Sequence, residues 1–320
     1  MSDQTRMFWI HALTPLHVGA GRGVGYIDLP ILREKVTNLP LVPGSAIKGV
    51  FADKHSATDE KRQSDPIFRA AFGISDPRGG AEAGANSGSL VFSDARLVCL
   101  PVRSLFGTFA WCTSPLILQR LHRDLEAAGL GSRVKAPSSL KSETSIHVPQ
   151  GTSSALQDSN KRVFLEDLDL TAEPCPTAAA WATELGTWLF GTDSHWSKTF
   201  TERFAVVPDN VFNFLSETGT EVTARVRIDD EQKTVAKGAL WYEESLPAES
   251  ILAGLVWCDR VFGLKNNGGS PITQFELLDQ FCPTVADKDN SILQIGGKAT
   301  VGKGRVRCAF TSSGKNGGQL

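Results

Sequence analysis

The feature that most constrains the fold is an alternation of apolar and polar side chains between residues 221 and 242. Apolar residues at every second position of EVTARVRI are followed by the polar turn DDEQK and by the returning segment TVAKGALWY. A period of two places successive side chains on opposite faces of a strand, so the pattern predicts a β-hairpin with Arg225 and Arg227 on one face. This hairpin could be part of an ordinary sheet or an arm that reaches over a ligand, and the pattern leaves both open.

Composition places the chain among ordinary globular proteins. Its 320 residues are 41% hydrophobic and 21% charged, enough for about two average domains or one domain with large insertions. No segment has the roughly 18 continuous apolar residues of a membrane span, and the first twenty residues do not resemble a signal peptide, so we expect a cytoplasmic protein with no membrane partner. The six cysteines form no Cys-x-x-Cys pair, which favours reduced core residues over a zinc cluster or disulfides.

The charges are unevenly distributed although the net charge is only −2. Residues 295–320 carry five basic side chains and no acidic one, and residues 96–141 carry seven basic against two acidic. Residues 202–249 show the reverse, with five basic and ten acidic side chains. Basic surface gathered on one side would suit a nucleic acid, but the counts alone slightly favour ordinary solvated faces.

The remaining patterns predict more β than α structure. We expect strands at 7–14, 90–102, 251–262 and 306–310, and helices at 45–54, 64–73, 114–129 and 272–282. Ser45 and Ser114 are expected to cap two of these helices, and Ser64 or Asp65, followed by Pro66, is expected to cap the helix at 64–73. Residues 76–95 are predicted to contain a flexible loop, and the polar segment 131–161 is predicted to be a lid-like insertion outside the core.

Two glycine-rich loops lie near the two ends of the sequence, at 16–25 and 295–307. In the second, IGGKATVGKGRVR, glycines leave backbone N–H groups accessible and the adjacent lysines and arginines attract anions, so the loop suits phosphate oxygens. It has neither the spacing of a P-loop nor the following helix of a dinucleotide-binding motif. Surface turns of this composition are common, and the loop alone is weak evidence.

Asp28 lies in GYIDLPILREK, directly after the first glycine loop. The residues alone favour a turn or capping carboxylate there. The following segment, Pro43 to Gly49, would present a helix N-terminus, Ser45 and Lys48 to a phosphate, or simply a capped helix with a solvated lysine.

The ordered set of segments carries a family resemblance over nearly the whole chain. LHVGAGRGVGYIDLPILREK, LPLVPGSAIKGVF and IGGKATVGKGRVR resemble the RAMP superfamily of CRISPR RNA-binding proteins. YIDLPI, PVRSLFGTFAWCTSP and the segment from FAVVPDN to KGALWYEESLPAES resemble, more narrowly, the repeated backbone subunit of type III-B, or Cmr-type, effector complexes.

The resemblance implies an α+β fold: a single domain over residues 1–320, with a ferredoxin-like, RRM-related palm, insertions and a thumb hairpin within 210–250. It implies as partners a CRISPR guide RNA, a target RNA, other copies of the chain in a helical filament, and other Cmr-type subunits. The thumb would distort the guide–target duplex at regular intervals, and the subunit would cut target RNA there in antiviral defence.

The resemblance also implies site residues. Asp28 matches the aspartate required for endoribonuclease activity, with His17 and Tyr26 as possible assistants. A free aspartate, with a pKa of about 3.9, is a poor general base at neutral pH, so we favour Asp28 as a ligand of Mg²⁺ or another divalent cation over proton abstraction. The residues expected to contact RNA are Arg33, Gly44, Ser45, Lys48, Arg225, Arg227, Trp241, Gly297, Lys298, Lys303 and Arg305.

Two other functions stay open at this point. The chain could be a non-catalytic RNA-binding scaffold with cleavage by another subunit. A guide-processing ribonuclease of the same superfamily is less favoured, because such enzymes usually depend on histidine chemistry for which no motif is present.

Overall fold

The computed structural model describes residues 4–21, 23, 25–55, 58–74, 86–191, 193–228, 231, 235–262, 272–284 and 291–312. Its helices are α1 (Gly44–His55), α2 (Asp59–Ser64), α3 (Pro66–Phe72), α4 (Pro115–Ala127), α5 (Pro176–Phe190), α6 (Ser194–Arg203), α7 (Asp209–Thr218) and α8 (Gln274–Phe281). Short 3₁₀ turns lie at Gly131–Arg133 and Ala299–Val301. No helix of the described part is long and apolar enough to cross a bilayer.

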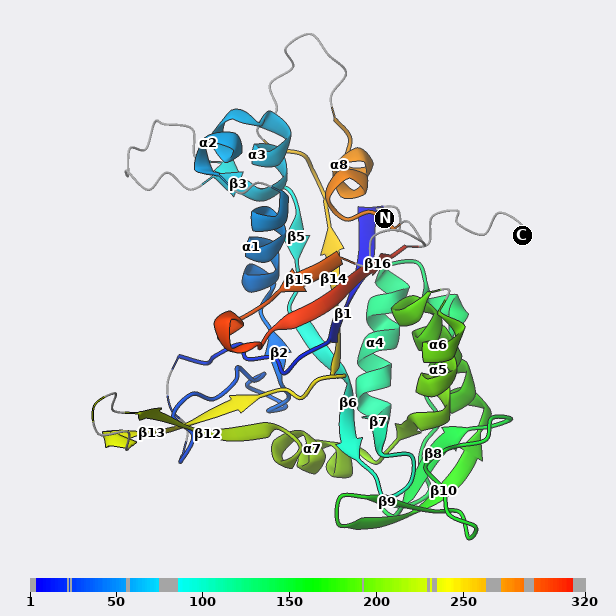
Figure 1. Ribbon diagram of the computed structural model, residues 1–320. Coiled ribbons are helices and arrows are strands. Elements are labelled where there is room, and N and C mark those ends of the chain that lie inside the picture. Colours follow the sequence, from blue (N-terminus) through cyan, green and yellow to red (C-terminus); the bar gives the residue numbers. More distant parts are fainter. Residues whose placement is uncertain are drawn as a thin grey trace.

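Within those ranges, twelve strands form one large, mostly antiparallel sheet in the order β15-β16-β1-β14-β6-β7-β11-β8-β10-β9, with β2 beside β6 and β5 beside β14 (Figure 1). The strands of this sheet are β1 (Thr5–Ala12), β2 (Leu41–Val42), β5 (Val91–Phe92), β6 (Ala95–Arg103), β7 (Phe109–Thr113), β8 (Ser145–Pro149), β9 (Arg162–Leu165), β10 (Leu168–Cys175), β11 (Phe204–Val206), β14 (Ile251–Trp257), β15 (Ser291–Gln294) and β16 (Arg305–Thr311). The pairs β3 (Gly73–Ile74) with β4 (Asn86–Ser87), and β12 (Glu221–Ile228) with β13 (Val235–Ser245), are separate.

Strand β1 separates two hydrophobic cores because its side chains alternate between the sheet faces. Phe8 and Ile10 pack into the core that includes residues of α1, α3, α7 and α8. Met7 and Trp9 pack into the other core, which includes residues of α4, α5 and α6. Figure 1 shows α1 and the α4–α6 group on either side of β1. Trp111, Trp181 and Trp188 also lie in the second core, and all six cysteines are buried and unpaired.

The predicted hairpin is present as β12 and β13, paired antiparallel from Glu221 with Ser245 to Ile228 with Val235. It extends away from the large sheet (Figure 1). The hairpin is therefore not part of the large sheet but projects from it as an arm, and its contact with a ligand stays a prediction.

The predicted helix caps hold in part. Asp65 accepts hydrogen bonds from the backbone N–H groups of Ile67 (2.9 Å) and Phe68 (3.2 Å), and Ser114 accepts one from Ile117 (3.4 Å). The prediction that Ser45 caps α1 is wrong. The helix begins at Gly44, so Ser45 lies in its first turn.

Two predicted loops differ from the structure. Ser145–Pro149, expected in a lid-like insertion at 131–161, is the buried strand β8 between β11 and β10. The strand was not predicted because it is short and because polar, Ser/Thr-rich residues surround it, although its apolar side chains face the core. Of the loop expected at 76–95, residues 76–85 lie outside the described residues, and 86–94 contain β4 and β5. Helices α5 to α7 were not predicted.

Candidate RNA-binding and cleavage site

Asp28 lies on the surface where the loop after β1 meets the base of the hairpin. Its Oδ2 accepts a hydrogen bond from the backbone N–H of Tyr242 on β13 (2.8 Å). The next residue, Leu29, pairs with Glu243 as a parallel β-bridge. Its N–H donates to the Tyr242 carbonyl (3.1 Å) and its carbonyl accepts from the N–H of Glu244 (3.0 Å). The segment that carries Asp28 is thus hydrogen-bonded to β13 of the hairpin through an isolated β-bridge.

The two residues expected to assist Asp28 occupy different positions. Tyr26 is 74% exposed, with its ring edge-on to that of Tyr242 at 6.3 Å between centroids. His17 is buried, and its Nδ1 lies 2.6 Å from the Glu244 carbonyl oxygen, to which it must donate. The structure therefore brings Asp28 and Tyr26 together at the surface, while His17 supports the loops beneath them.

The C-terminal glycine loop packs directly on His17. The N–H of Gly297 donates to the His17 carbonyl (2.9 Å), and Gly296 has a φ of +77° with no space for a Cβ against that same carbonyl oxygen. The backbone of Lys298 also adopts the left-handed conformation, with a φ of +66°. Glycine at 296 is therefore required both by its dihedral angle and by the close approach of two backbones.

Three cations converge on one buried carboxylate. Glu243 Oε1 accepts from the Lys298 ammonium (2.8 Å), and its Oε2 lies 3.5 Å from Nε of Arg225 and 3.7 Å from Nζ of Lys303. Burial raises the pKa of Glu243, but hydrogen bonds from Lys298 and Trp241 and the two lysine charges outweigh it and lower the pKa to about 2. Together, Glu243 and its three cationic partners carry a net positive charge between the glycine loop and the hairpin.

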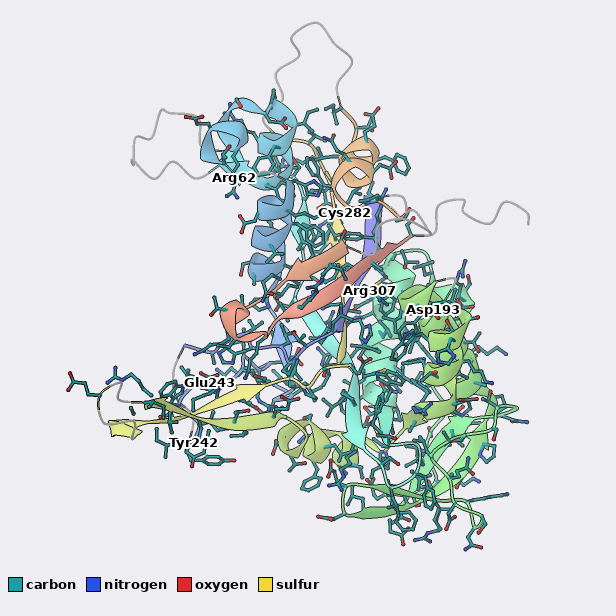
Figure 2. The ribbon with its side chains drawn as sticks, viewed as in Figure 1. Arg62, Asp193, Tyr242, Glu243, Cys282 and Arg307 are labelled. Atoms are coloured by element: carbon teal, nitrogen blue, oxygen red, sulfur yellow. The ribbon has the colours of Figure 1, made fainter. Side chains whose placement is uncertain are left out.

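The other expected RNA contacts on these two elements differ in accessibility. Arg227 and Arg305 are exposed, and neither guanidinium has a protein partner among the described residues. Trp241 is half-buried, and its Nε1 donates to Glu243 Oε1 (2.8 Å). Figure 2 shows Tyr242 and Glu243 on β13, with side chains on opposite sides of the strand. The two arginines are free to contact a ligand, whereas the indole N–H of Trp241 is already satisfied.

The start of α1 is fixed by the sheet rather than by its own cap. The N–H of Gly44 donates to Asp94 Oδ1 (2.9 Å), and a Cβ at Gly44 would overlap the carbonyl of Phe92. Ser45 is exposed. The Lys48 ammonium donates to the Leu90 carbonyl (2.9 Å), and burial lowers its pKa. Ser45 is thus accessible to a phosphate, while Lys48 already has a protein partner.

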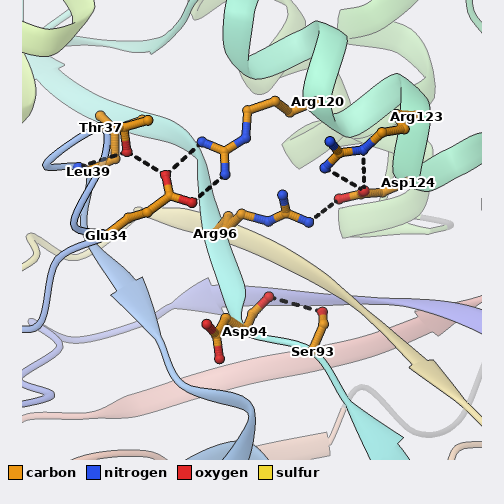
Figure 3. A network of polar contacts seen from close by, with 9 residues as sticks. All are labelled: Glu34, Thr37, Leu39, Ser93, Asp94, Arg96, Arg120, Arg123 and Asp124. Atoms are coloured by element: carbon orange, nitrogen blue, oxygen red, sulfur yellow. Dashed lines mark hydrogen bonds and ion pairs between the residues drawn. The ribbon is translucent and has the colours of Figure 1, made fainter.

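Beyond Asp28 the chain is anchored by two ion pairs. Arg33 contacts Glu244 Oε1 (2.6 Å) and the carbonyls of Asn38 (2.9 Å) and Ser216 (3.2 Å). Glu34 accepts two hydrogen bonds from Arg120 on α4, at 2.6 and 2.8 Å (Figure 3). Arg33, expected to contact RNA, is therefore occupied by protein acceptors. The anchors fix residues 31–34 between the hairpin and α4.

Replacing Glu34 by glutamine tests this anchor through its pH dependence. The hydrogen bonds from Arg120 lower the pKa of Glu34 from 4.5 to about 2, against the opposing effect of partial burial. A carboxyl group with a lowered folded-state pKa stabilises the fold above its unfolded pKa and loses that contribution as the pH falls towards the folded value. We expect Glu34→Gln to lower the free energy of unfolding by about 1–2 kcal/mol at pH 7, since the pair is partly exposed.

The difference from the wild type should shrink as the pH falls from about 4.5 towards 2. Urea unfolding at neutral and acidic pH measures it, with Glu126→Gln on the exposed face of α4 as the matched control. A difference that stayed constant on acidification would contradict the assignment.

A family model for the RAMP superfamily matches residues 9–307, which span the first glycine loop, the Asp28 segment, the hairpin and the C-terminal glycine loop. The chain belongs to the RAMP superfamily. This RAMP protein is 32% identical over 314 residues, 97% of its length and 96% of the relative, to "CRISPR system Cmr endoribonuclease Cmr4" of Pyrococcus furiosus. It is 24% identical to "CRISPR system CMR subunit Cmr4" of Saccharolobus solfataricus, covering 93% and 94% of the two chains.

Solved structures of the same kind share the fold. The crystal structure of oligomeric Cmr4 from Pyrococcus furiosus superimposes with a TM-score of 0.68 at 24% identity, over 98% of this chain and 99% of that one. A chain of the type III-B Cmr-beta complex bound to cognate target RNA gives 0.64 at 19% identity, over 96% of each chain. The large mixed sheet with its flanking helices is thus the fold of this RAMP protein and of the Cmr4 structures.

Metal binding at this site would depend on RNA. Among the described residues of this RAMP protein, no group of three His, Cys, Asp or Glu side chains is placed to hold a metal ion. Mg²⁺ is commonly bound by one or two carboxylates together with substrate phosphates, and the single exposed carboxylate of Asp28 fits that arrangement. The chemistry of the donor set is therefore compatible with a cation shared between Asp28 and RNA.

Sequence reasoning missed the buried carboxylates Glu243 and Glu244. Strand alternation in LWYEES places these neighbours on opposite faces, which was a usable signal that each meets a different partner. Their actual partners lie far away in the sequence, at Arg33, Lys298 and Lys303, and no spacing rule connects them.

Proposed function

We propose that this RAMP protein is the guide-RNA-binding backbone subunit of a type III-B CRISPR ribonucleoprotein and cuts complementary target RNA at regular intervals in antiviral defence. The proposal is supported by its full-length similarity to a Cmr endoribonuclease. The observation that carries it is the position of Asp28: an exposed carboxylate, hydrogen-bonded at the base of an extended hairpin and close in the fold to a cationic glycine loop.

The proposed reaction uses the nucleophile that RNA itself provides. A 2′-hydroxyl cleaves the adjacent linkage when it is rotated into line with the phosphorus and the leaving oxygen, and holding that geometry supplies much of the rate. The hairpin displaces a nucleotide of the target strand, and Asp28 lies at the base of that hairpin. The Tyr242 N–H orients the Asp28 carboxylate, and the exposed Tyr26 ring borders the same surface.

A divalent cation such as Mg²⁺, held by Asp28 and RNA phosphates, would stabilise the charge that develops at the scissile phosphate. Direct proton abstraction by Asp28 is the second possibility within the same proposal. Both require an ionised carboxylate at this position.

Guide RNA would lie along the cationic surface. Lys298 and Arg225 supply positive charge around Glu243, and the exposed Arg227 and Arg305 are available for phosphates. Lys303 is buried and its ammonium donates to the Ser245 hydroxyl (2.7 Å), so it adds charge from beneath this surface. Gly297 lets the RNA backbone approach the glycine loop, and the exposed Ser45 lies at the N-terminus of α1, where a phosphate is favoured by the helix dipole. Lys48 would add its charge to that site, and Trp241 would offer an aromatic face to a base.

We propose further that the central part of the sheet is a ferredoxin-like, RRM-related palm and that the chain assembles with other copies in a helical filament and with other Cmr-type subunits. Such a guide-bound complex would act in the cytoplasm, where RNA of an invader is translated.

The exposed Arg305 gives a direct test of RNA binding. Removing one cation that neutralises a phosphate should reduce the slope of log affinity against log salt by about 0.7–0.9, so Arg305→Gln should lower guide-RNA affinity most at low salt and flatten the slope by that amount. Filter binding or fluorescence anisotropy at several salt concentrations measures it. Lys198→Gln, an exposed lysine on α6, is the control. An unchanged slope for Arg305→Gln would remove this residue from the RNA surface.

The proposed function is tested by reconstituting the complex on a defined guide and mapping target cuts, with and without divalent metal. We expect regularly spaced fragments that disappear on chelation and return with added Mg²⁺. Regular cuts from a complex assembled with Asp28→Asn subunits would assign cleavage elsewhere and leave this chain as a scaffold.

A further inference from the structure

Glu244 is a buried carboxylate on β13 that faces the Asp28 loop rather than the glycine loop. It is 3% exposed. Its Oε2 accepts from the backbone N–H of Ile31 (3.0 Å), and its Oε1 accepts from the guanidinium of Arg33 (2.6 Å) and the hydroxyl of Thr220 (3.0 Å). Thr220 directly precedes β12, so this single side chain on β13 connects the loop to the residue that leads into the other strand of the hairpin.

The backbone of Glu244 makes two further contacts with the same loop. Its N–H donates to the carbonyl of Leu29 (3.0 Å), and its carbonyl accepts from His17 Nδ1 (2.6 Å). Glu244 therefore contacts the loop before Asp28, at His17, and after it, at Leu29, Ile31 and Arg33. The hydrogen bond of Asp28 itself goes to Tyr242, two residues away on the same strand.

A carboxylate is a costly choice for this position if packing were its only purpose. Removing a charge from water is expensive, and an apolar side chain of similar volume often stabilises a core at least as well. Hydrogen bonds to three donors from two segments, the Asp28 loop and the residue before β12, instead fix direction and distance. The arrangement transmits any shift of the hairpin base to the residues that flank Asp28.

We propose that Glu244 is a positioning residue that couples the hairpin to the Asp28 loop. Through this coupling, the position of the hairpin bound to the guide–target duplex determines the position of the Asp28 carboxylate. This inference rests on the proposed function of Asp28. It adds to that function a reason why cleavage occurs only where a hairpin is docked.

Glu244→Gln is the most informative variant because it keeps the size of the side chain. A glutamine has one acceptor oxygen, and its NH₂ group must face one of the donors Ile31, Arg33 or Thr220. In the reconstituted complex we expect the single-turnover cleavage rate at saturating target to fall about tenfold or more, as misplaced catalytic groups do. The target concentration for half-saturation should stay within about twofold of wild type, because the RNA-contacting cations are untouched.

Hydrogen exchange provides a readout besides activity. The amide of Ile31 should exchange faster in Glu244→Gln, while amides in β8 and α5 should not change. Glu217→Gln, an exposed carboxylate on α7 that contacts Asn38 of the neighbouring turn, is the matched control and should cleave like the wild type.

Thr220→Val removes one donor to Glu244 with little change of shape and serves if Glu244→Gln fails to assemble. It should lower the same rate by about two- to fivefold without weakening target binding. Wild-type cleavage by both variants, or an equal loss of binding and cleavage, would overturn the inference. If Asp28→Asn were also fully active, the proposed function itself would fall, whereas an inactive Asp28→Asn beside a fully active Glu244→Gln would remove only the coupling.

Discussion

Asp28→Asn should abolish regular target cleavage while leaving guide and target binding intact. The asparagine oxygen can still accept the hydrogen bond from the Tyr242 N–H, so the loop keeps its position and only the charge is removed. Loss of a charged group that handles a proton or a cation in the transition state typically lowers the rate by about 10²- to 10⁴-fold. Single-turnover assays on the reconstituted complex, together with target affinity, measure both quantities.

Asp169→Asn is the matched control for this substitution. Asp169 is a half-exposed carboxylate on β10 paired with Arg162, on a strand that contributes nothing to the proposed site. It should cleave at the wild-type rate. Regular fragments from the Asp28→Asn complex at that same rate would show that Asp28 is a turn residue and that the catalytic group lies elsewhere.

Gly296→Ala should remove guide binding by disordering the glycine loop. An alanine there combines an unfavourable positive φ with an overlap between its Cβ and the carbonyl oxygen of His17, a backbone atom that cannot turn aside. Positive φ alone costs about 1–2 kcal/mol, and the overlap should raise the total to about 3 kcal/mol or more. Thermal unfolding and guide-RNA affinity are the two measurements.

Gly302→Ala separates the two causes. Gly302 has a similar φ of +83° but nothing lies within 4 Å of its added Cβ. It should therefore cost only about 1 kcal/mol and bind guide RNA nearly as the wild type does. Equal losses in both alanine variants would mean that the positive φ, and not the overlap with His17, accounts for the effect of Gly296→Ala.

The parts of the fold with local signals were predictable from the sequence. Alternation identified the hairpin, and Asp65, Ser114 and the prolines after them identified the starts of α3 and α4. Strand β8 escaped because its five residues are buried within a polar surrounding segment. The start of α1 is set by Asp94, fifty residues away, and a cap supplied from such a distance leaves no mark beside the helix.

The candidate site was predictable only where the family resemblance reached it. Asp28 and Lys298 follow from segments that resemble the family. Composition could not distinguish Arg33, bound to protein acceptors, from Arg305, which is exposed, because exposure depends on the three-dimensional partners. Which of these residues contact RNA stays a prediction.

The two cores on either side of β1 also divide the molecule's intrinsic fluorescence. Four of the seven tryptophans, Trp9, Trp111, Trp181 and Trp188, lie in the core covered by α4, α5 and α6. Trp241 stands apart on the hairpin, beside Arg225. Emission from the whole chain therefore reports mainly on the half that lies away from the proposed RNA surface, and a Trp241→Phe comparison is needed to isolate the signal of a nucleotide that binds at the arm.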